Sequence, residues 1–150
     1  MPITNFPFRR ISQDILGIED PTERPRPWLN VRIINPDTKK SLPYFGLVDT
    51  GSDNVAIPAD FAEPLGHNLT AGRHKTVGTG AGKANAYEHT TEIQIMDDED
   101  SLLYQIPNTP IDFMEGLEVV LLGVANFLDN FILTVNYHQQ VFSIKRSQNV

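Results

Sequence analysis

Short runs of β-branched and aromatic residues, separated by turn-forming residues, constrain the fold of this chain more than any other feature. Strand-like alternation begins at Trp28, and turn signals such as Asn35-Pro36-Asp37 interrupt it. One or two helical turns are expected at 125–130. So many short strands with so little helix predict an all-β barrel or sandwich. The expected strands cover residues 28–34, 44–48, 55–58, 74–77, 86–96, 102–106, 117–122, 131–137 and 141–145.

The chain is long enough for one domain with its own hydrophobic core, since it has 150 residues. Residues 1–26 hold four prolines and only a weak helical pattern near residues 11–18, so an arm or linker is expected there. Strand patterns dominate from residue 27 to residue 146, and this segment is the expected domain. Residues 147–150 are expected to form a tail.

The acidic composition excludes several kinds of partner. The net charge of −7 and the pI of about 4.9 argue against nucleic-acid binding, which needs a basic surface, and against docking on an anionic membrane. No apolar run is long enough for a signal sequence or a membrane span, so a soluble cytoplasmic protein is expected. The absence of cysteine excludes disulfides, cysteine nucleophiles and thiolate metal sites.

The histidines and the acidic residues lack the spacing of a metal site. His67, His74, His89 and His138 show no paired ligand pattern and are interpreted as surface or packing residues. The acidic run at 97–100 lacks the spaced oxygen ligands and the glycine of a calcium loop, so a solvated hairpin turn is expected. We therefore expect no metal ion and no cofactor.

One carboxylate, Asp49, lies between an apolar run and a glycine turn in the sequence Leu47-Val48-Asp49-Thr50-Gly51-Ser52. Burial of the apolar flank would place the acid on a rigid support. Gly51 lets the backbone approach a ligand closely, and its N–H can bond the carboxylate. Aspartate and glycine are also common in plain turns between strands, so the tripeptide alone leaves both interpretations open.

Two further elements accompany Asp49 at characteristic distances. About thirty residues later, the glycine-rich segment 78–82 forms the expected tip of a hairpin. Val77 and Ala84 stand where a phosphate-binding loop needs glycine and serine or threonine, which argues against phosphate binding. An ordinary glycine-rich hairpin remains an alternative to a mobile one. The other element is the apolar run 119–122 with Gly123, followed by Asn-Phe-Leu at 126–128.

The order and spacing of these three elements resemble those of the retropepsin-like aspartic proteases over residues 27–146. The resemblance implies an all-β, closed barrel with a flap hairpin and one short C-terminal helix. It implies a polypeptide substrate and no cofactor. The residues that it assigns to catalysis are Asp49, Thr50 and Gly51, and those that it assigns to substrate binding are Ser52, Asp53, Gly78, Thr79, Gly80, Ala81 and Gly82.

The resemblance also implies a mechanism. A single Asp-Thr-Gly supplies half of a catalytic dyad, so a homodimer would bring two copies of Asp49 together. Two close carboxylates share one proton, as is established for aspartic proteases. Thr50 would bond across the dimer, Gly51 would offer its carbonyl to substrate, and Asp53 would contact the substrate backbone. A Ser52 hydroxyl that donates to the dyad would stabilise its charged form, and on that basis we expect an acidic pH optimum.

The sequence departs from the family pattern at two places. Val124 follows the second glycine, where retroviral enzymes usually have the arginine that pairs with the acid matching Asp53. The N-terminal arm of 1–26 does not match termini that interleave in a shared sheet, and the closing hairpin of 131–145 looks more like that of cellular and bacterial relatives. The alternative to an endopeptidase is therefore a catalytically weak or inactive module of the same fold that binds or assembles proteins.

Overall fold

Strand pairing determines the architecture. The computed structural model describes residues 4–147. Its helical segments are short: α1 (Ala62–Leu65), the π-helix η1 (Ile11–Ile15) and the 3-10 turns η2 (Ala59–Phe61), η3 (Leu69–Ala71) and η4 (Leu128–Asn130). Its strands are β1 (Thr4–Pro7), β2 (Trp28–Ile34), β3 (Ser41–Val48), β4 (Ala56–Pro58), β5 (Arg73–Thr79), β6 (Gly82–Met96), β7 (Leu102–Met114), β8 (Val120–Leu122), β9 (Phe131–Asn136) and β10 (Val141–Arg146).

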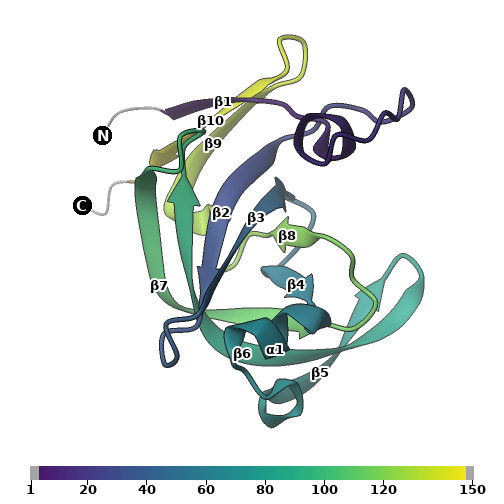
Figure 1. Cartoon of the computed structure of the whole chain (residues 1–150), viewed down its shortest axis with the longest axis vertical. Coiled ribbons are helices and arrows are strands. Elements are labelled where there is room, and N and C mark those ends of the chain that lie inside the picture. The colour runs from purple at the N-terminus through teal and green to yellow at the C-terminus, as the bar shows by residue number, and fades with distance from the viewer. Residues whose placement is uncertain (1–3, 148–150) are drawn as a thin grey trace.

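The larger sheet has the strand order β2-β3-β8-β4-β7-β6-β5, and β2 also pairs with β6. The pairings therefore return to β2 and run around a ring, while β5 extends from it as the outer strand of a hairpin with β6 (Figure 1). β8 is parallel to β3, and β4 is parallel to β7. The short strands β4 and β8 lie next to each other between the long strands β3 and β7.

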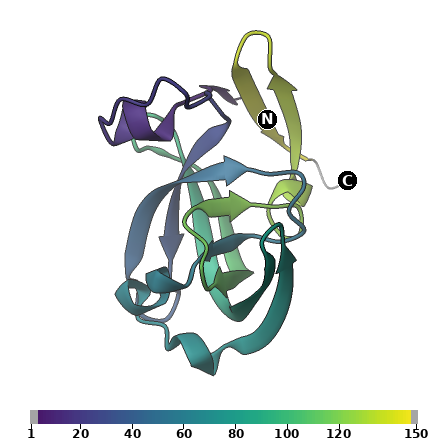
Figure 2. The same cartoon turned by 90° about the vertical axis from the view of Figure 1, so that its right-hand side faces the viewer.

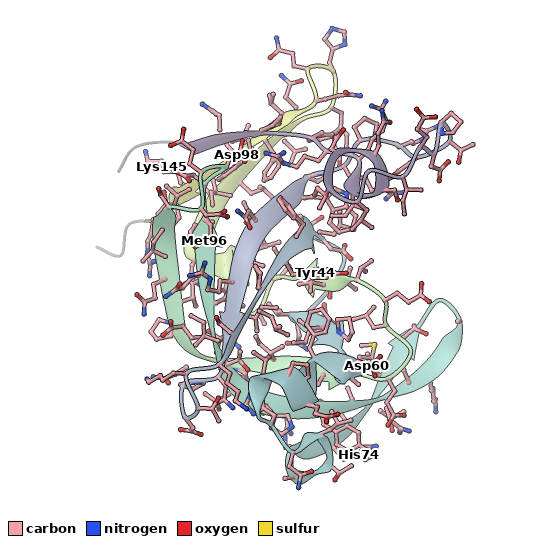
Figure 3. All side chains as sticks on the ribbon, in the orientation of Figure 1. Tyr44, Asp60, His74, Met96, Asp98 and Lys145 are labelled. Carbon is pink, nitrogen blue, oxygen red and sulfur yellow. The ribbon has the colours of Figure 1, made fainter. Side chains whose placement is uncertain are left out.

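The main core lies inside this ring. Period-two alternation directs Leu29, Val31 and Ile33 of β2 inward, where each is at most 1 % exposed. Ile93 and Ile95 of β6 meet them in the same cluster. β-Branched side chains suit this pleated surface, and burying each one contributes roughly 1.5–3 kcal/mol. Side chains from the surrounding strands fill the space inside the ring (Figure 3).

A separate three-stranded sheet has the order β1-β10-β9. Its β9–β10 hairpin projects from one end of the molecule (Figure 2). Phe6 of β1 stacks on Phe142 of β10 with ring centroids 5.2 Å apart. The segment expected to be an arm thus includes a strand that packs on the closing hairpin. A boundary at residue 26 remains a prediction.

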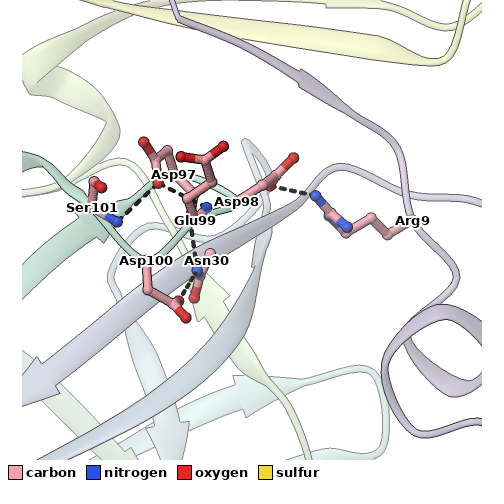
Figure 4. A network of polar contacts seen from close by, with 7 residues as sticks. All are labelled: Arg9, Asn30, Asp97, Asp98, Glu99, Asp100 and Ser101. Carbon is pink, nitrogen blue, oxygen red and sulfur yellow. Dashed lines mark hydrogen bonds and ion pairs between the residues drawn. The ribbon is translucent and has the colours of Figure 1, made fainter.

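The acidic turn at residues 97–100 connects β6 to β7 and touches the N-terminal segment (Figure 4). Asp97 Oδ1 accepts two backbone N–H bonds within the turn, at 2.9 and 2.8 Å. Asp98 forms an ion pair with Arg9. The predicted hairpin turn is confirmed, and its acids also hold the chain that crosses over it.

The sequence interpretation was wrong about the extent of two elements. The helix expected at 125–130 is reduced to the 3-10 turn η4. Asn126 has a left-handed φ of 64°, and Phe127 has φ −128° and ψ −80°, so no helix passes through them. β7 continues beyond the expected residue 106 to Met114, past Pro107 and Pro110.

Both ends of the chain reach beyond the described part. Residues 1–3 and 148–150 are outside it, so the predicted tail at 147–150 is described only at Ser147. Within 4–147, no helix has the length and apolar character needed to cross a membrane.

Candidate active site

Asp49 follows directly after β3, where buried apolar residues hold the strand in the sheet. Val48 is 8 % exposed and pairs with Leu122 of β8. The backbone N–H of Asp49 donates to the carbonyl of Leu122 at 3.1 Å. The Asp49 side chain is half-buried, and its Oδ1 accepts the N–H of Gly51 at 2.9 Å. The predicted Gly51 hydrogen bond is confirmed, so the carboxylate has a fixed backbone support.

The loop after Asp49 packs tightly against the loop after β8. The N–H of Val124 donates to the carbonyl of Ser52 at 2.9 Å. A Cβ at Gly123 would lie 2.2 Å from the carbonyl oxygen of Asn54 and 2.5 Å from that of Ser52. Both oxygens are backbone atoms with little room to move, so only glycine fits at position 123. This contact joins the two glycine elements that the sequence singled out.

The expectation for the Ser52 hydroxyl was wrong. Ser52 Oγ donates to the carbonyl of Asn54 at 2.8 Å, which closes a local turn. A hydroxyl has one proton to donate, so this bond takes the proton that was expected to reach the Asp49 carboxylate. The Ser52 hydroxyl therefore does not stabilise the charged form of Asp49, which was the reason to expect an acidic pH optimum. The acidic optimum itself remains a prediction.

A cleft of about 420 Å³ opens in front of Asp49, between the loop that carries it and the β5–β6 hairpin. The acidic residues that line it are Asp49, Asp53 and Asp112, and none of its lining residues is a lysine, arginine or histidine. The predicted residues that line it are Asp49, Gly51, Ser52, Asp53, Gly78, Thr79 and Gly80. The lining residues that sequence reasoning missed are Asn54, Ala56, Val77, Asp112, Met114, Leu117 and Leu121.

The tip of the β5–β6 hairpin, residues 78–82, is exposed. A Cβ at Gly78 or Gly80 would have no atom within 4 Å. Within the tip, Thr79 Oγ1 donates to the carbonyl of Gly82 at 3.0 Å, and Gly82 has a positive φ of 118°. Ala81 and Gly82 do not line the cleft, whereas the other three tip residues do.

Asp112 of β7 is the buried acid of the cleft, since it is only 4 % exposed. Its Oδ1 lies 2.7 Å from the Nζ of Lys75 on β5, which also lies 3.1 Å from Glu88 of β6. Burial alone would lower the pKa of Lys75, but the hydrogen bonds to Asp112 and Glu88 raise it above its usual range. The hydrogen bond from Arg73, and then the hydrogen bond and charge of Lys75, lower the pKa of Glu88 against the opposing effect of burial. Lys75 is therefore held in its charged form.

No family model matches the chain, and no curated protein sequence matches it. Solved structures do match. The crystal structure of a retropepsin-like aspartic protease from Rickettsia conorii is 16 % identical, has a TM-score of 0.61, and aligns over 95 % of this chain and 91 % of that chain. The chain has the retropepsin-like fold. EIAV protease complexed with the inhibitor HBY-793 is 20 % identical, with a TM-score of 0.43 over 71 % of this chain and 88 % of that chain.

Within this retropepsin-like fold, Thr50 faces away from the cleft. It is exposed and lines a second hollow of about 640 Å³, which Asp49 also borders. Arg24 and Arg26 from the N-terminal segment and Tyr137 from the β9–β10 turn lie on its other sides. Asp49 is thus accessible from two sides.

Val124, where an arginine was expected from the family pattern, presents an exposed apolar side chain. Val124 is 40 % exposed, and the Ala125 N–H donates to the Asp53 carbonyl at 2.7 Å. The Asp53 side chain is exposed and has no ion pair with any residue between 4 and 147. Backbone hydrogen bonds, rather than an ion pair, therefore hold this loop within residues 4–147.

The histidines lie apart from this site. The rings of His67 and His89 are 4.6 Å apart, and both pack edge-on against Phe113 at 5.2 Å. In the described part of the chain, no three histidine or acidic side chains are grouped closely enough to hold a metal ion.

Proposed function

We propose that the protein is an aspartic endopeptidase that acts on polypeptides as a homodimer. The observation that carries the proposal is the setting of Asp49: a carboxylate fixed by the Gly51 N–H in a cleft beside a glycine-rich hairpin. Such a hairpin can fold over an extended peptide and exclude water. Apolar residues of the cleft, such as Met114 and Leu121, suit hydrophobic residues near the scissile bond.

The proposed dimer completes the site. One chain holds one Asp-Thr-Gly, so a dyad requires a second copy of Asp49. The hollow beside Thr50 leaves Asp49 open on the side away from the hairpin. A twofold axis on that side would bring the two carboxylates together, with the two Thr50 side chains beneath them.

The proposed reaction uses one water and one proton shared by the dyad. The ionised copy of Asp49 accepts a proton from the water molecule as the water oxygen attacks the scissile carbonyl carbon. The protonated copy of Asp49 donates its proton to the carbonyl oxygen. Collapse of the tetrahedral intermediate breaks the C–N bond. The Asp49 copy that took the proton from water donates it to the leaving nitrogen, and the other copy takes back a hydroxyl proton of the intermediate. The apparent pKa values of the reaction belong to the pair rather than to either carboxyl.

A peptide-library cleavage assay tests this function, with wild type and Asp49→Asn compared at several pH values. We expect cleavage by wild type and a loss of at least about 1,000-fold in Asp49→Asn, because an amide cannot act as the base. Sedimentation over a concentration series should show a dimer. Equal cleavage by both proteins would contradict the proposal, as would activity by a protein that stays monomeric at the assay concentration.

The second candidate is a binding or assembly module of the same fold. Asp53 is exposed and has no ion pair within residues 4–147, and Val124 beside it is exposed. Both favour this candidate, because the described residues do not form the usual ion pair of the loop. Absence of cleavage by wild type, combined with binding of unmodified peptides in the cleft, would establish this candidate instead.

A further inference from the structure

The wall of the cleft opposite the Asp49 loop is apolar except at one position. Asp112 and Met114 lie on the face of β7 that borders the cleft, while Ile111 and Phe113 point into the main core. Met114 belongs to a small second cluster with Ala56 and Ala86, and Val77, Ala84, Leu117 and Leu121 pack against it. Asp112 thus places a carboxylate at the edge of an otherwise apolar surface.

Stability does not account for an acid at this position. A carboxylate that is 4 % exposed loses most of its hydration, and the Lys75 ammonium only offsets that loss. Replacing a buried ion pair with apolar residues of similar size is often neutral or stabilising. The neighbours on this wall include alanine, valine, methionine and leucine, and Glu88 keeps its ion pair with Arg73 when Lys75 is replaced, so an apolar pair would fit the surroundings.

One oxygen of Asp112 remains available. Oδ1 lies 2.7 Å from the Lys75 ammonium, whereas Oδ2 has no hydrogen-bond donor among the side chains of residues 4–147 and is not sealed from solvent. The Lys75 bond also fixes the orientation of the carboxylate. Within residues 4–147 the lining of the cleft contains three acids and no basic residue. Lys75, which lies outside the lining, balances one of the three, so the remaining local charge favours a cation or a hydrogen-bond donor over an anion.

We propose that Asp112, oriented by Lys75, is a specificity residue of the cleft that selects substrate side chains with an apolar stem and a terminal N–H donor, lysine and arginine above all. The inference rests on the proposed peptidase function. The apolar wall would take the stem and Oδ2 would take the donor. A site built to hydrogen-bond one substrate group discriminates strongly against analogues that lack it.

The sheet gives the approximate subsite. Asp49 follows β3, and Asp112 lies on β7, three strand spacings away along the order β3-β8-β4-β7. Strands lie about 4.8 Å apart, so the lateral separation is roughly 14 Å along the sheet and shorter where the sheet curves. Asp112 shares a register row with Leu47, and Asp49 is two residues further along the chain. An extended peptide advances about 3.3 Å per residue. The selected side chain is therefore within about five residues of the scissile bond.

Cleavage profiling tests this inference with three proteins: wild type, Asp112→Asn and the double variant Lys75→Met/Asp112→Leu. The peptides carry lysine, norleucine, glutamine or glutamate at each position in turn. For wild type we expect kcat/KM for lysine to exceed that for norleucine by about tenfold or more at one subsite. Asp112→Asn should lose the preference for lysine, and the double variant should prefer norleucine. Thermal unfolding checks that each variant folds, and the double variant keeps the test valid if Asp112→Asn does not.

A binding arm separates this inference from the proposed function. The same peptides are immobilised, and binding is measured for Asp49→Asn and for Asp49→Asn/Asp112→Asn. If wild type cleaves but all three proteins share one profile, the role of Asp112 is overturned while the peptidase stands. If wild type cleaves nothing, a lysine preference in binding that disappears with Asp112 supports the site and rejects the peptidase. Equal binding of lysine and norleucine rejects the site.

Discussion

Two carboxylates line the same cleft and are supported in opposite ways. Asp49 is half-buried, and a backbone N–H from Gly51 holds its Oδ1. Asp112 is 4 % exposed, and a side-chain cation, Lys75, holds its Oδ1. A backbone donor fixes the position of Asp49 without adding a full opposite charge next to it. The charge of Asp112 is instead balanced by Lys75, and this difference agrees with the roles proposed above, proton transfer for Asp49 and recognition for Asp112.

The two supports also differ in what they depend on. The support of Asp49 comes from two loops packed backbone against backbone at Gly123, so it depends on chain geometry. The support of Asp112 comes from side chains on three adjacent strands, β5, β6 and β7. Mutations should therefore damage the first through steric clash and the second through unbalanced charge.

The largest effect is expected for Gly123→Ala, which disrupts the backbone contact between the loop after β8 and the loop after Asp49. The new Cβ would lie 2.2 Å from the Asn54 carbonyl oxygen, so the two loops must separate. We expect a loss of more than about 4 kcal/mol of stability, a range that only major clashes reach. Urea unfolding measures it. Gly78→Ala is the matched control, because a Cβ there meets nothing within 4 Å. Equal stability of both variants would show that the two loops can move apart at little cost in free energy.

The next effect is expected for Lys75→Met, which removes the cation beside Asp112. An unbalanced buried carboxylate costs roughly 3–5 kcal/mol, and Lys75→Met/Asp112→Leu should recover most of that loss. Asp49→Asn should change stability by less than about 0.5 kcal/mol, since the oxygen of the new side-chain amide can still accept the Gly51 N–H. Chemical unfolding of wild type, Lys75→Met, Asp112→Leu and the double variant gives the coupling free energy. A coupling near zero would mean that Lys75 and Asp112 do not depend on each other.

The fold was largely predictable because strand periodicity is a local property. The runs at 28–34, 86–96 and 131–137 match β2, β6 and β9 closely, and the turn residues between them identify the hairpins. Irregular backbone was not predictable. The helix expected at 125–130 fails at Asn126 and Phe127, which directly follow the two residues, Val124 and Ala125, whose N–H groups bond the loop after Asp49.

The site was predictable only where a local motif marks it. Asp49, Gly51 and the glycine-rich tip are neighbours of recognisable turns, so sequence alone locates them. Asp112 and Lys75 are 37 positions apart and meet only because β5, β6 and β7 pair in register. No local pattern signals such a pair; the one hint was an acid inside an apolar strand. The Ser52 error has a similar origin, because the sequence does not say which acceptor a hydroxyl chooses.

A smaller effect is expected for Ser52→Ala, which separates the loop structure from the dyad. Loss of the bond to the Asn54 carbonyl should cost about 1 kcal/mol, the usual value of one hydrogen bond. Because that hydroxyl does not donate to Asp49, the acid limb of the pH profile for kcat/KM should stay in place. Cleavage rates of wild type and variant across the acidic range measure this. A clear displacement of the limb would restore a direct role for Ser52 in the dyad.

The smallest effect is expected behind the cleft wall, at His67. Burial, and then the nearby charge of His89, lower the pKa of His67 from 6.5 despite the opposing charge of Asp37. Its Nε2 is buried without a hydrogen-bond partner in the described structure. On the cleft face of the same sheet, the hydrogen bond from Arg73, and then the hydrogen bond and charge of Lys75, lower the pKa of Glu88 from 4.5. In both cases the unfolded chain binds the proton more readily, so acidification favours unfolding.

Stability should therefore fall in two windows, first as the pH drops below 6.5 and again as it drops below 4.5. His67→Phe keeps a ring against Phe113 but cannot take up a proton, so it should flatten only the first window. Glu88→Gln should flatten only the second. At pH 7 the His67 variant should stay within about 1 kcal/mol of wild type. Thermal unfolding from pH 7.5 to pH 3.5 measures both. If His67→Phe leaves the upper window unchanged, another group titrates there, and the two faces of this sheet do not respond to pH independently.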